Sequence, residues 1–165
     1  MIASGAVFAF ALASPASHVD GEVAPTFRLS PLVKPGPAVV LTAHEGGPVV
    51  LVFFASWCVP CRQELPVLAR VADEVANGAA GGPARETRFI GVDVEDSLLG
   101  AEQLVKTAGV AYPVGVDPSG RVATGLYHLV GLPGTIFIGT GGRIVHVSRG
   151  PVSQGVALSW IKRIA

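Results

Sequence analysis

The chain has 165 residues and a mass of 16.9 kDa, which is the size of one ordinary domain. Half of the residues are hydrophobic and only 15% are charged, so intrinsic disorder of the whole chain is excluded. Twelve Lys and Arg balance twelve Asp and Glu, with no basic stripe to neutralise phosphates, so no nucleic-acid partner is expected.

The N-terminal segment, residues 1–17, contains no charged side chain. Its apolar stretch at residues 2–13 has the length of the hydrophobic region of a secretory signal and is short for a membrane span. Small residues follow, as a cleavage site requires, but no Lys or Arg precedes the stretch. We expect residues 1–23 to be a signal-like or anchoring segment with a linker, and residues 24–165 to be one domain. The protein would then be extracytoplasmic, either secreted, periplasmic or membrane-anchored; the alternative is a buried N-terminal element of the fold.

Residues 27–29 and 39–41 are short strand candidates in a proline-rich stretch. Residues 49–55 form a continuous apolar run, which is typical of a strand buried on both faces of a sheet. After this run, apolar residues recur at three- and four-residue spacing as far as Asn77, which predicts a long helix. Pro66 lies inside this helix, where a kink is expected.

A second buried strand is predicted at residues 89–94. Ser97 can cap the helix that follows, and Gly109 stands where a left-handed residue would end it. A third short strand is predicted at residues 112–116, and a short helix at residues 120–127.

Residues 135–138 and 144–147 predict two strands of an antiparallel hairpin. A last helix then presents Val156, Trp160 and Ile164 on one face. Since strands alternate with helices before the hairpin and helix close the chain, the predicted class is α/β, with a central mixed sheet flanked by helices.

The two cysteines stand three residues apart in Trp57-Cys58-Val59-Pro60-Cys61, where the buried strand gives way to the helix. The first turn of a helix has unpaired N–H groups and a partial positive charge, which would stabilise a thiolate at Cys58. Cys61 lies one turn further on the same face, and Pro60 suits the first turn because it lacks an N–H. This arrangement predicts a redox centre in which Cys58 attacks and Cys61 resolves the mixed disulfide.

Most other interpretations of the cysteine pair require further residues. A metal site would need further ligands, and His44, His128 and His146 are not at ligand spacing. Haem attachment would need a histidine at the position of Arg62. An inert disulfide remains an alternative, whereas a peroxidase would need a cysteine outside the pair and an activating Arg/Thr pocket, and neither is evident. We therefore expect no cofactor and no metal besides the redox-active disulfide, and we expect the histidines to be surface or packing residues.

The segment Gly131-Leu132-Pro133-Gly134-Thr135 immediately precedes a predicted strand. The Leu132–Pro133 peptide bond could be cis, and such a turn exposes a backbone edge that can pair with an extended substrate. Taken alone, however, the segment indicates an ordinary Pro-Gly turn.

Together, the buried strand, the Trp-Cys-Val-Pro-Cys motif, the proline-containing helix and the Gly-Leu-Pro-Gly-Thr turn resemble the thioredoxin superfamily. Within it, residues 24–165 are similar to the TlpA/ResA/DsbE-like extracytoplasmic thiol–disulfide oxidoreductases. This resemblance implies a thioredoxin-like fold with an αβ insert at residues 97–116. It also implies that Cys58 is the exposed nucleophile, that Cys61 is the buried resolving thiol, and that Pro133 is a cis-proline packed against the disulfide.

The resemblance also bears on the acidic residues. Cytosolic thioredoxins carry a buried Asp six residues before the first cysteine, where this chain has Val52. TlpA-like proteins often carry an acidic residue three positions after the second cysteine, and Glu64 stands there. Glu64 could relay a proton during thiol exchange, or it could be a solvated helix carboxylate. Asp93 ends its predicted strand, and a role in the turn is expected for it.

The resemblance implies exchange of the dithiol or disulfide with protein substrates, with Trp57, Pro60 and Leu132 at the substrate-binding surface. A reductant of extracytoplasmic proteins such as apocytochrome c is the favoured function. A DsbA-like oxidant is one alternative, and a non-enzymatic thioredoxin-fold module that binds metal or acts as a chaperone is another. A membrane electron donor or oxidant is the expected partner, and the protein is expected to be a monomer.

Overall fold

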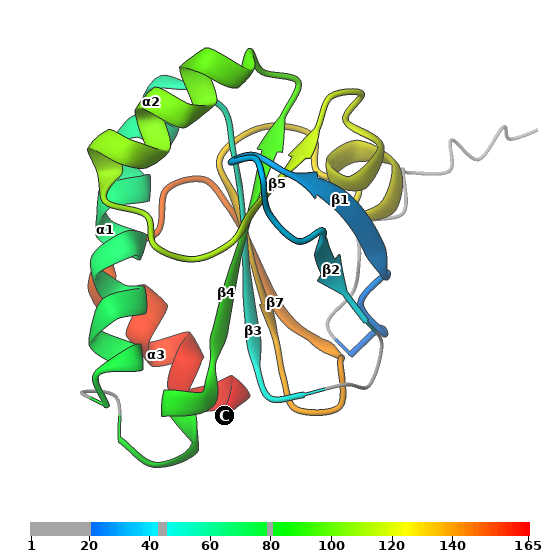
Figure 1. Cartoon of the computed structure of the whole chain (residues 1–165). Helices are drawn as coiled ribbons and strands as arrows, with labels where there is room; N and C mark the ends of the chain where they lie inside the picture. Colours follow the sequence, from blue (N-terminus) through cyan, green and yellow to red (C-terminus); the bar gives the residue numbers. More distant parts are fainter. Residues whose placement is uncertain (1–20, 43–45, 79–80) are drawn as a thin grey trace, which may run out of the picture.

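The computed structural model describes residues 21–42, 46–78 and 81–165 as a β-sheet with helices packed on it (Figure 1). The strands are β1 (Phe27–Pro31), β2 (Val39–Leu41), β3 (Val49–Phe54), β4 (Arg88–Val94), β5 (Val114–Asp117), β6 (Gly134–Ile138) and β7 (Ile144–Arg149). The helices are α1 (Val59–Ala76), α2 (Leu98–Ala108) and α3 (Gln154–Ile164), with a short 3₁₀ helix η1 (Gly82–Glu86) and a π-helix η2 (Arg121–Leu126).

The sheet has the strand order β2-β1-β5-β4-β3-β6-β7. Strands β3, β4 and β5 run parallel, because helical connections lead from each to the next, whereas the remaining neighbours pair antiparallel. The predicted α/β class, with a central mixed sheet flanked by helices, is therefore confirmed.

Strand β3 lies at the centre of the sheet and is buried along its whole length. Its alternate residues divide between two hydrophobic cores. Val50, Val52 and Phe54 pack into the core that also contains buried residues of α1 and α3. Leu51 and Phe53 pack into the second core, which contains residues of η2. The unbroken apolar run follows from this two-sided burial.

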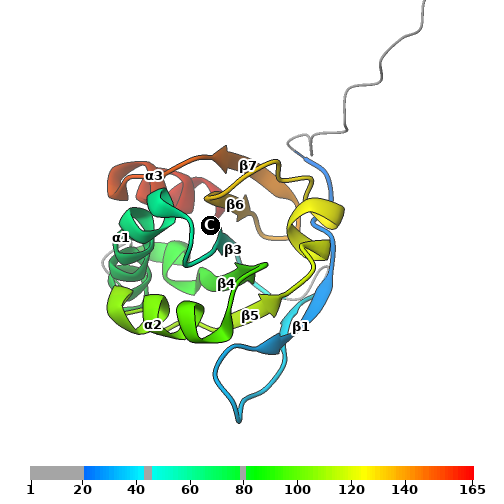
Figure 2. The same cartoon turned by 90° about the horizontal axis from the view of Figure 1, so that it is seen from above.

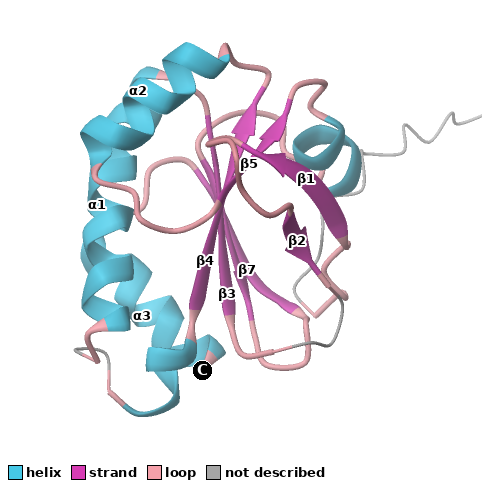
Figure 3. Cartoon of the chain, in the orientation of Figure 1, coloured by secondary structure: helices cyan, strands magenta, loops and turns pink. Residues whose placement is uncertain are grey.

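Figure 2 shows the layers: α1, α2 and α3 lie on one side of the sheet, and the segment that contains η2 lies on the other. Because β3 and β4 are parallel, they end at the same edge of the sheet. Strand β3 leads into α1 there, and β4 leads into α2 (Figure 3). The segments that open these two helices are therefore brought together, and Ser56 before α1 hydrogen-bonds to Asp96 before α2.

The third central strand differs from its prediction. It begins at Val114 rather than at residue 112. Pro113 precedes it and has no N–H to donate to a neighbouring strand, but its carbonyl accepts the Gly91 N–H at 2.9 Å.

The predicted contact face of the last helix was wrong at one position. Val156 is 45% exposed, whereas Ala157, Ile161 and Ile164 are buried. The buried stripe begins one residue later than predicted, because the packing of α3 on α1 and β6, rather than the spacing of its apolar residues, decides which face is covered.

The chain contacts the sheet before β1 begins. The N–H groups of Gly21 and Ala24 donate to the carbonyls of Ile144 and Gly142 at 2.7 and 2.8 Å. The predicted division at residue 23 stays a prediction. Among the described residues, no helix is both long enough and apolar enough to cross a membrane, and the apolar stretch at residues 2–13 lies outside them.

Candidate active site

Cys58 and Cys61 form a disulfide at the start of α1, with a Cα–Cα distance of 5.2 Å. Cys58 is the N-cap residue, and its extended backbone lets its Sγ accept the Cys61 N–H at 3.2 Å. Pro60 lies in the first turn, where its missing N–H costs no intrahelical hydrogen bond. Sequence and fold thus direct N–H groups and the positive end of the helix dipole toward Cys58.

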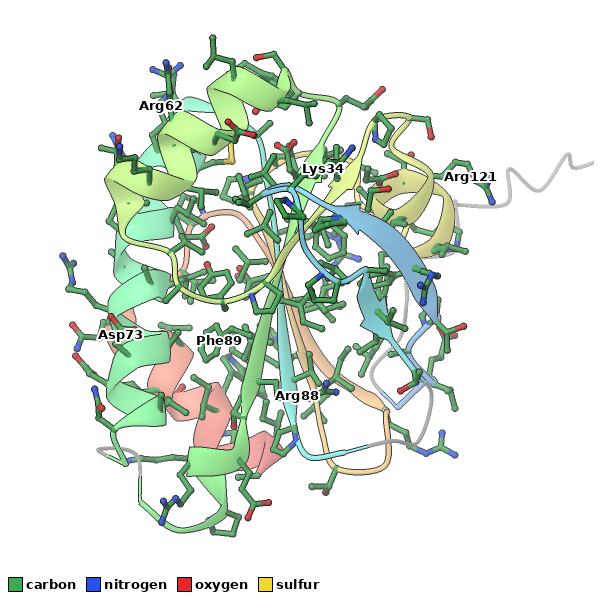
Figure 4. The ribbon with its side chains drawn as sticks, viewed as in Figure 1. Lys34, Arg62, Asp73, Arg88, Phe89 and Arg121 are labelled. Atoms are coloured by element: carbon green, nitrogen blue, oxygen red, sulfur yellow. A yellow bond between two sulfur atoms is a disulfide. The ribbon has the colours of Figure 1, made fainter. Side chains whose placement is uncertain are left out.

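The expected exposure of Cys58 is not seen in this disulfide form, where both cysteines are buried. Cys58 is 5% exposed and Cys61 is 0% exposed. Trp57 stands beside them and is 57% exposed, with its Nε1–H donating to the Glu95 carbonyl at 3.1 Å. Figure 4 labels Arg62 in the first turns of α1, at the end of the helix that carries the cysteines. The redox centre therefore lies just beneath the surface, and a large aromatic side chain projects beside it.

Glu64 is buried in α1 rather than solvated, so the alternative of a solvated helix carboxylate was wrong. It is 3% exposed. Its Oε1 accepts the Val152 N–H at 2.8 Å and the Thr135 Oγ1–H at 3.4 Å. Burial raises the pKa of Glu64 to about 7, and these two hydrogen bonds oppose the rise because they stabilise the carboxylate. A group with this pKa can both take up and release a proton near neutral pH.

The Leu132–Pro133 peptide bond is cis, and Pro133 is buried at the start of β6. Leu132 packs against the core that contains both cysteines. A cavity of about 190 Å³ brings Leu132 and Trp57 together, although they are distant in sequence. Its other lining residues are Val94, Glu95, Ala123, Thr124, Leu129, Val130 and Gly131. Pro60 is half-buried and does not line this cavity.

The turn role expected for Asp93 was wrong. It is not in a turn but inside β4, fully buried, and neither carboxylate oxygen has a hydrogen-bond partner. The carboxyl of Asp96 acts on Asp93, and Asp96 was not among the predicted site residues. The alternation of side chains along β4 indicates this burial. Asp93 follows Phe89 at even spacing, so both face the same side of the sheet, and Phe89 belongs to the core under the helices.

The structure describes two of the four histidines, and neither lines the cavity between Trp57 and Leu132. His128 is exposed with a φ of 50°, and the His146 ring stacks on Trp160 with 4.0 Å between centroids. His44 lies outside the described residues. In the part of the chain that the structure covers, no group of three His, Cys, Asp or Glu side chains could hold a metal ion.

Comparison with known proteins identifies the family. A model of the AhpC/TSA family matches residues 21–147. The chain belongs to this family. The thiol-disulfide oxidoreductase ResA of Bacillus subtilis is 27% identical over 145 residues, which is 88% of this chain and 75% of ResA. The thiol:disulfide interchange protein CycY of Rhizobium leguminosarum is 30% identical over 118 residues, which is 70% of this chain and 56% of CycY.

Solved structures give the same result. A thiol:disulfide interchange protein of the thioredoxin family from Chlorobium tepidum is 26% identical, with a TM-score of 0.72. The match covers 90% of this chain and 99% of that one. The predicted thioredoxin-like fold is confirmed, with α2 and β5 in the region of the predicted insert. The predicted class of enzyme is confirmed as well: the chain is a thiol–disulfide oxidoreductase with its own cysteine pair as the redox centre.

Proposed function

We propose that the protein acts outside the cytoplasm as a reductant of disulfides in other proteins. The observation that carries the proposal is the Cys58–Cys61 disulfide at the N-cap of α1, with the Cys58 Sγ against the Cys61 N–H. In the reduced protein the same N–H and the helix dipole stabilise a Cys58 thiolate, which is the nucleophilic form. The relatives named above are a thiol-disulfide oxidoreductase and a thiol:disulfide interchange protein, which supports thiol–disulfide exchange as the chemistry.

The reaction begins with the reduced protein. The Cys58 thiolate attacks one sulfur of the substrate disulfide, and the other substrate sulfur leaves as a thiolate and takes up a proton. Cys61 then loses its proton and attacks Cys58 Sγ, which breaks the mixed disulfide and releases the second substrate sulfur. The substrate gains two electrons and two protons, and the enzyme is left with the Cys58–Cys61 disulfide.

Glu64 is the group that we assign to the proton of Cys61. It follows Cys61 by one turn of α1, so both side chains leave the same face of the helix. Its pKa of about 7 suits a base that takes the Cys61 proton and then passes it to the departing substrate thiolate. Thr135 and Val152 hold its Oε1, which keeps the carboxyl in one orientation.

The substrate chain would bind along the cis-Pro133 turn. Trp57 and Leu132 line one cavity beside the cysteines, which could hold an apolar side chain of the substrate. Val59 and Val130 add exposed apolar surface, at 62% and 87% exposure. Pro60 would limit how the substrate approaches Cys58, since it is half-buried in the same turn.

Two further parts of the proposal concern the environment of the protein. The apolar stretch at residues 2–13 supports export or anchoring, where a disulfide is stable. Repeated turnover needs a dithiol donor that reduces the Cys58–Cys61 disulfide, and a membrane electron donor is the partner that such a location suggests.

The proposal is tested with full-length reduced protein and insulin as a model disulfide substrate. Wild-type protein should reduce insulin catalytically when dithiothreitol regenerates it. Cys58→Ser should be inactive, and Cys61→Ser should accumulate a mixed disulfide with insulin because the resolving thiol is missing. Equal trapping by the two variants would contradict the assigned roles. Wild-type protein that oxidises reduced substrates but does not reduce insulin would contradict the direction.

A further inference from the structure

Asp93 is a buried acid that the proposed reaction does not use. It lies in β4 between Phe54 of β3 and Val116 of β5, on the side of the sheet that the helices cover. It is 0% exposed, and neither of its carboxylate oxygens has a hydrogen-bond donor. A buried carboxylate without donors is strongly disfavoured, so the environment favours the protonated form of Asp93.

Asp96 has the opposite bonding pattern. Its Oδ2 accepts the Ser56 N–H, and its Oδ1 accepts the Ser56 Oγ–H at 2.8 Å and the Ser97 N–H at 2.7 Å. Three donors mark Asp96 as the carboxylate of the pair. The Asp93 carboxyl lies within hydrogen-bonding reach of Asp96. A protonated Asp93 can therefore donate its O–H to Asp96.

We propose that Asp93 is a positioning residue of the redox site, which acts by donating its carboxyl O–H to Asp96 while Asp96 holds Ser56, two residues before Cys58. The residue before Asp96 also contacts the active-site segment, because the Trp57 Nε1–H donates to the carbonyl of Glu95. We call this set of contacts the carboxyl clasp. The inference rests on the proposed function only in taking Cys58 as the attacking thiol.

The surroundings of Asp93 leave Asp96 as the charged group that acts on it. Arg62 on α1 donates its Nε–H to the Ser56 carbonyl at 2.7 Å, so it supports the same segment without reaching Asp93. Strand β3 carries no charged residue. No other charged or titratable side chain of the described residues forms a hydrogen bond to Asp93. This holds for Glu64 on α1, Glu102 and Lys106 on α2, Asp117 on β5, Glu95 in the loop, and Tyr112 just before β5, whose hydroxyl also has no partner.

The clasp depends on pH, and the sign follows from the charges. Burial raises the pKa of Asp93 to about 7, and the neighbouring Asp96 carboxylate adds to the rise. Below this pH, Asp93 keeps its proton and the clasp is closed. Above it, Asp93 releases the proton to water, the two carboxylates repel each other, and the hold on Ser56 and Trp57 weakens.

Trp57 reports on the clasp in the oxidised protein, where the two cysteines are bonded to each other and do not titrate. The chain has two tryptophans, so Trp160→Phe makes Trp57 the single fluorophore and also removes the ring that stacks on His146. In this background we expect a change of Trp57 fluorescence centred near pH 7. The change should be absent in Asp93→Asn, because the asparagine amide can donate to Asp96 at every pH.

Asp73→Asn is the matched control. Asp73 is an exposed acid on α1 (Figure 4), about 18 Å further along the helix than Cys61 at 1.5 Å per residue. This variant should keep the wild-type transition, and so should Glu64→Gln. Asp96→Asn should move the transition to lower pH, because it removes the charge that opposes ionisation of Asp93. A transition that survives Asp93→Asn, or that disappears in Glu64→Gln, would overturn the proposal.

Two further measurements complete the test. In reduced protein at pH 8, Asp93→Asn should raise kcat/KM for insulin up to about tenfold over wild type, since only about a tenth of Asp93 keeps its proton one unit above its pKa. At pH 6 the two should agree. If Asp93→Asn does not fold, the pKa of Asp93 is measured instead from its carboxyl ¹³C signal in wild-type protein. A pKa in the ordinary Asp range of about 3.9 would overturn the proposal. Since the fluorescence test uses oxidised protein, its failure leaves the thiol chemistry of Cys58 untouched.

Discussion

Two buried carboxyls lie in the elements around the redox site, Glu64 in α1 and Asp93 in β4, and their bonding patterns are opposite. Glu64 on α1 accepts hydrogen bonds from Val152 and Thr135, whereas Asp93 on β4 has no donor and faces the carboxyl of Asp96. Burial raises the pKa of both to about 7. Hydrogen bonds oppose the rise at Glu64, and a second carboxyl adds to it at Asp93.

The difference shows that similar pKa values can serve different purposes. Glu64 has partners that stabilise its charged form, so it can alternate between acid and carboxylate during a reaction. Asp93 has a partner only for its protonated form, so losing the proton changes the structure around it. Glu64 is thus suited to proton transfer, and Asp93 is suited to holding the active-site segment.

The largest expected effect comes from replacing either of the two cysteines. Cys58→Ser should abolish reduction of a protein disulfide, because the attacking thiolate is lost. Cys61→Ser should allow one attack and then stop at the mixed disulfide. Non-reducing electrophoresis and mass spectrometry of each variant after incubation with insulin measure this. If Cys58→Ser accumulates the mixed disulfide instead, the two roles are reversed.

Glu64→Gln should come next in size. Glutamine keeps the size of the side chain but cannot accept the Cys61 proton, so resolution of the mixed disulfide should slow on the order of 10²-fold. The dependence of this rate on pH near 7 should become weaker as well, because only the contribution of Asp93 is left. Stopped-flow measurement of the resolving step across pH gives both quantities. Asp93→Asn serves as the comparison, and an equal loss in both variants would mean that Glu64 has no special part in proton transfer.

Stability against pH should separate the two carboxyls from ordinary surface acids. A raised pKa in the folded protein means that the folded state binds more protons than the unfolded state, so the unfolding free energy falls as pH rises through this window. The window runs from 4.5 to about 7 for Glu64 and from 3.8 to about 7 for Asp93. At about 1.4 kcal/mol per unit, each buried carboxyl should remove roughly 3–5 kcal/mol of stability across its window.

Urea unfolding of oxidised protein at several pH values measures this dependence. Glu64→Gln and Asp93→Asn should each flatten the decline between about pH 5 and pH 8, because an amide does not titrate. The control Asp73→Asn should keep the wild-type slope. A wild-type protein whose stability rises over this range would contradict the assigned ionisation states.

The smallest expected effect is at the substrate surface. Trp57→Ala removes an exposed aromatic side chain from the cavity that it shares with Leu132. We expect KM for a protein disulfide to rise about fivefold, which corresponds to about 1 kcal/mol, with kcat little changed. Val33→Ala, at another exposed apolar residue, is the control. A loss confined to kcat would instead place Trp57 in the chemical step.

The backbone around the site could be predicted from local sequence signals. The apolar run before Cys58 indicated the central strand, Gly109 adopts the left-handed conformation that ends α2, and the turn at Pro133 contains the anticipated cis bond. These features depend on neighbouring residues in the chain. The side-chain partners of the site come instead from distant segments, such as Val152 for Glu64, and no local pattern specifies them.

The two carboxyls illustrate where a signal was present but indecisive. Glu64 falls at helical spacing from Cys61 and Leu68, on the buried face of α1, yet a charged residue there also fits a solvated helix surface. Asp93 follows the alternation of β4 into the core, yet its place near the strand end favoured a turn. A lone acid in an apolar pattern was therefore compatible with two environments, and only contacts with distant segments, such as those of Glu64 with Thr135 and Val152, decide between them.

The reduction potential of the Cys58–Cys61 pair, measured in full-length protein against glutathione buffers, tests the central claim most directly. The proposed reductant should have a potential near that of thioredoxin, about −270 mV, so that electrons flow from its dithiol to the disulfides of its substrates. A potential near that of DsbA, about −120 mV, would make the protein an oxidant and contradict the proposed direction of transfer.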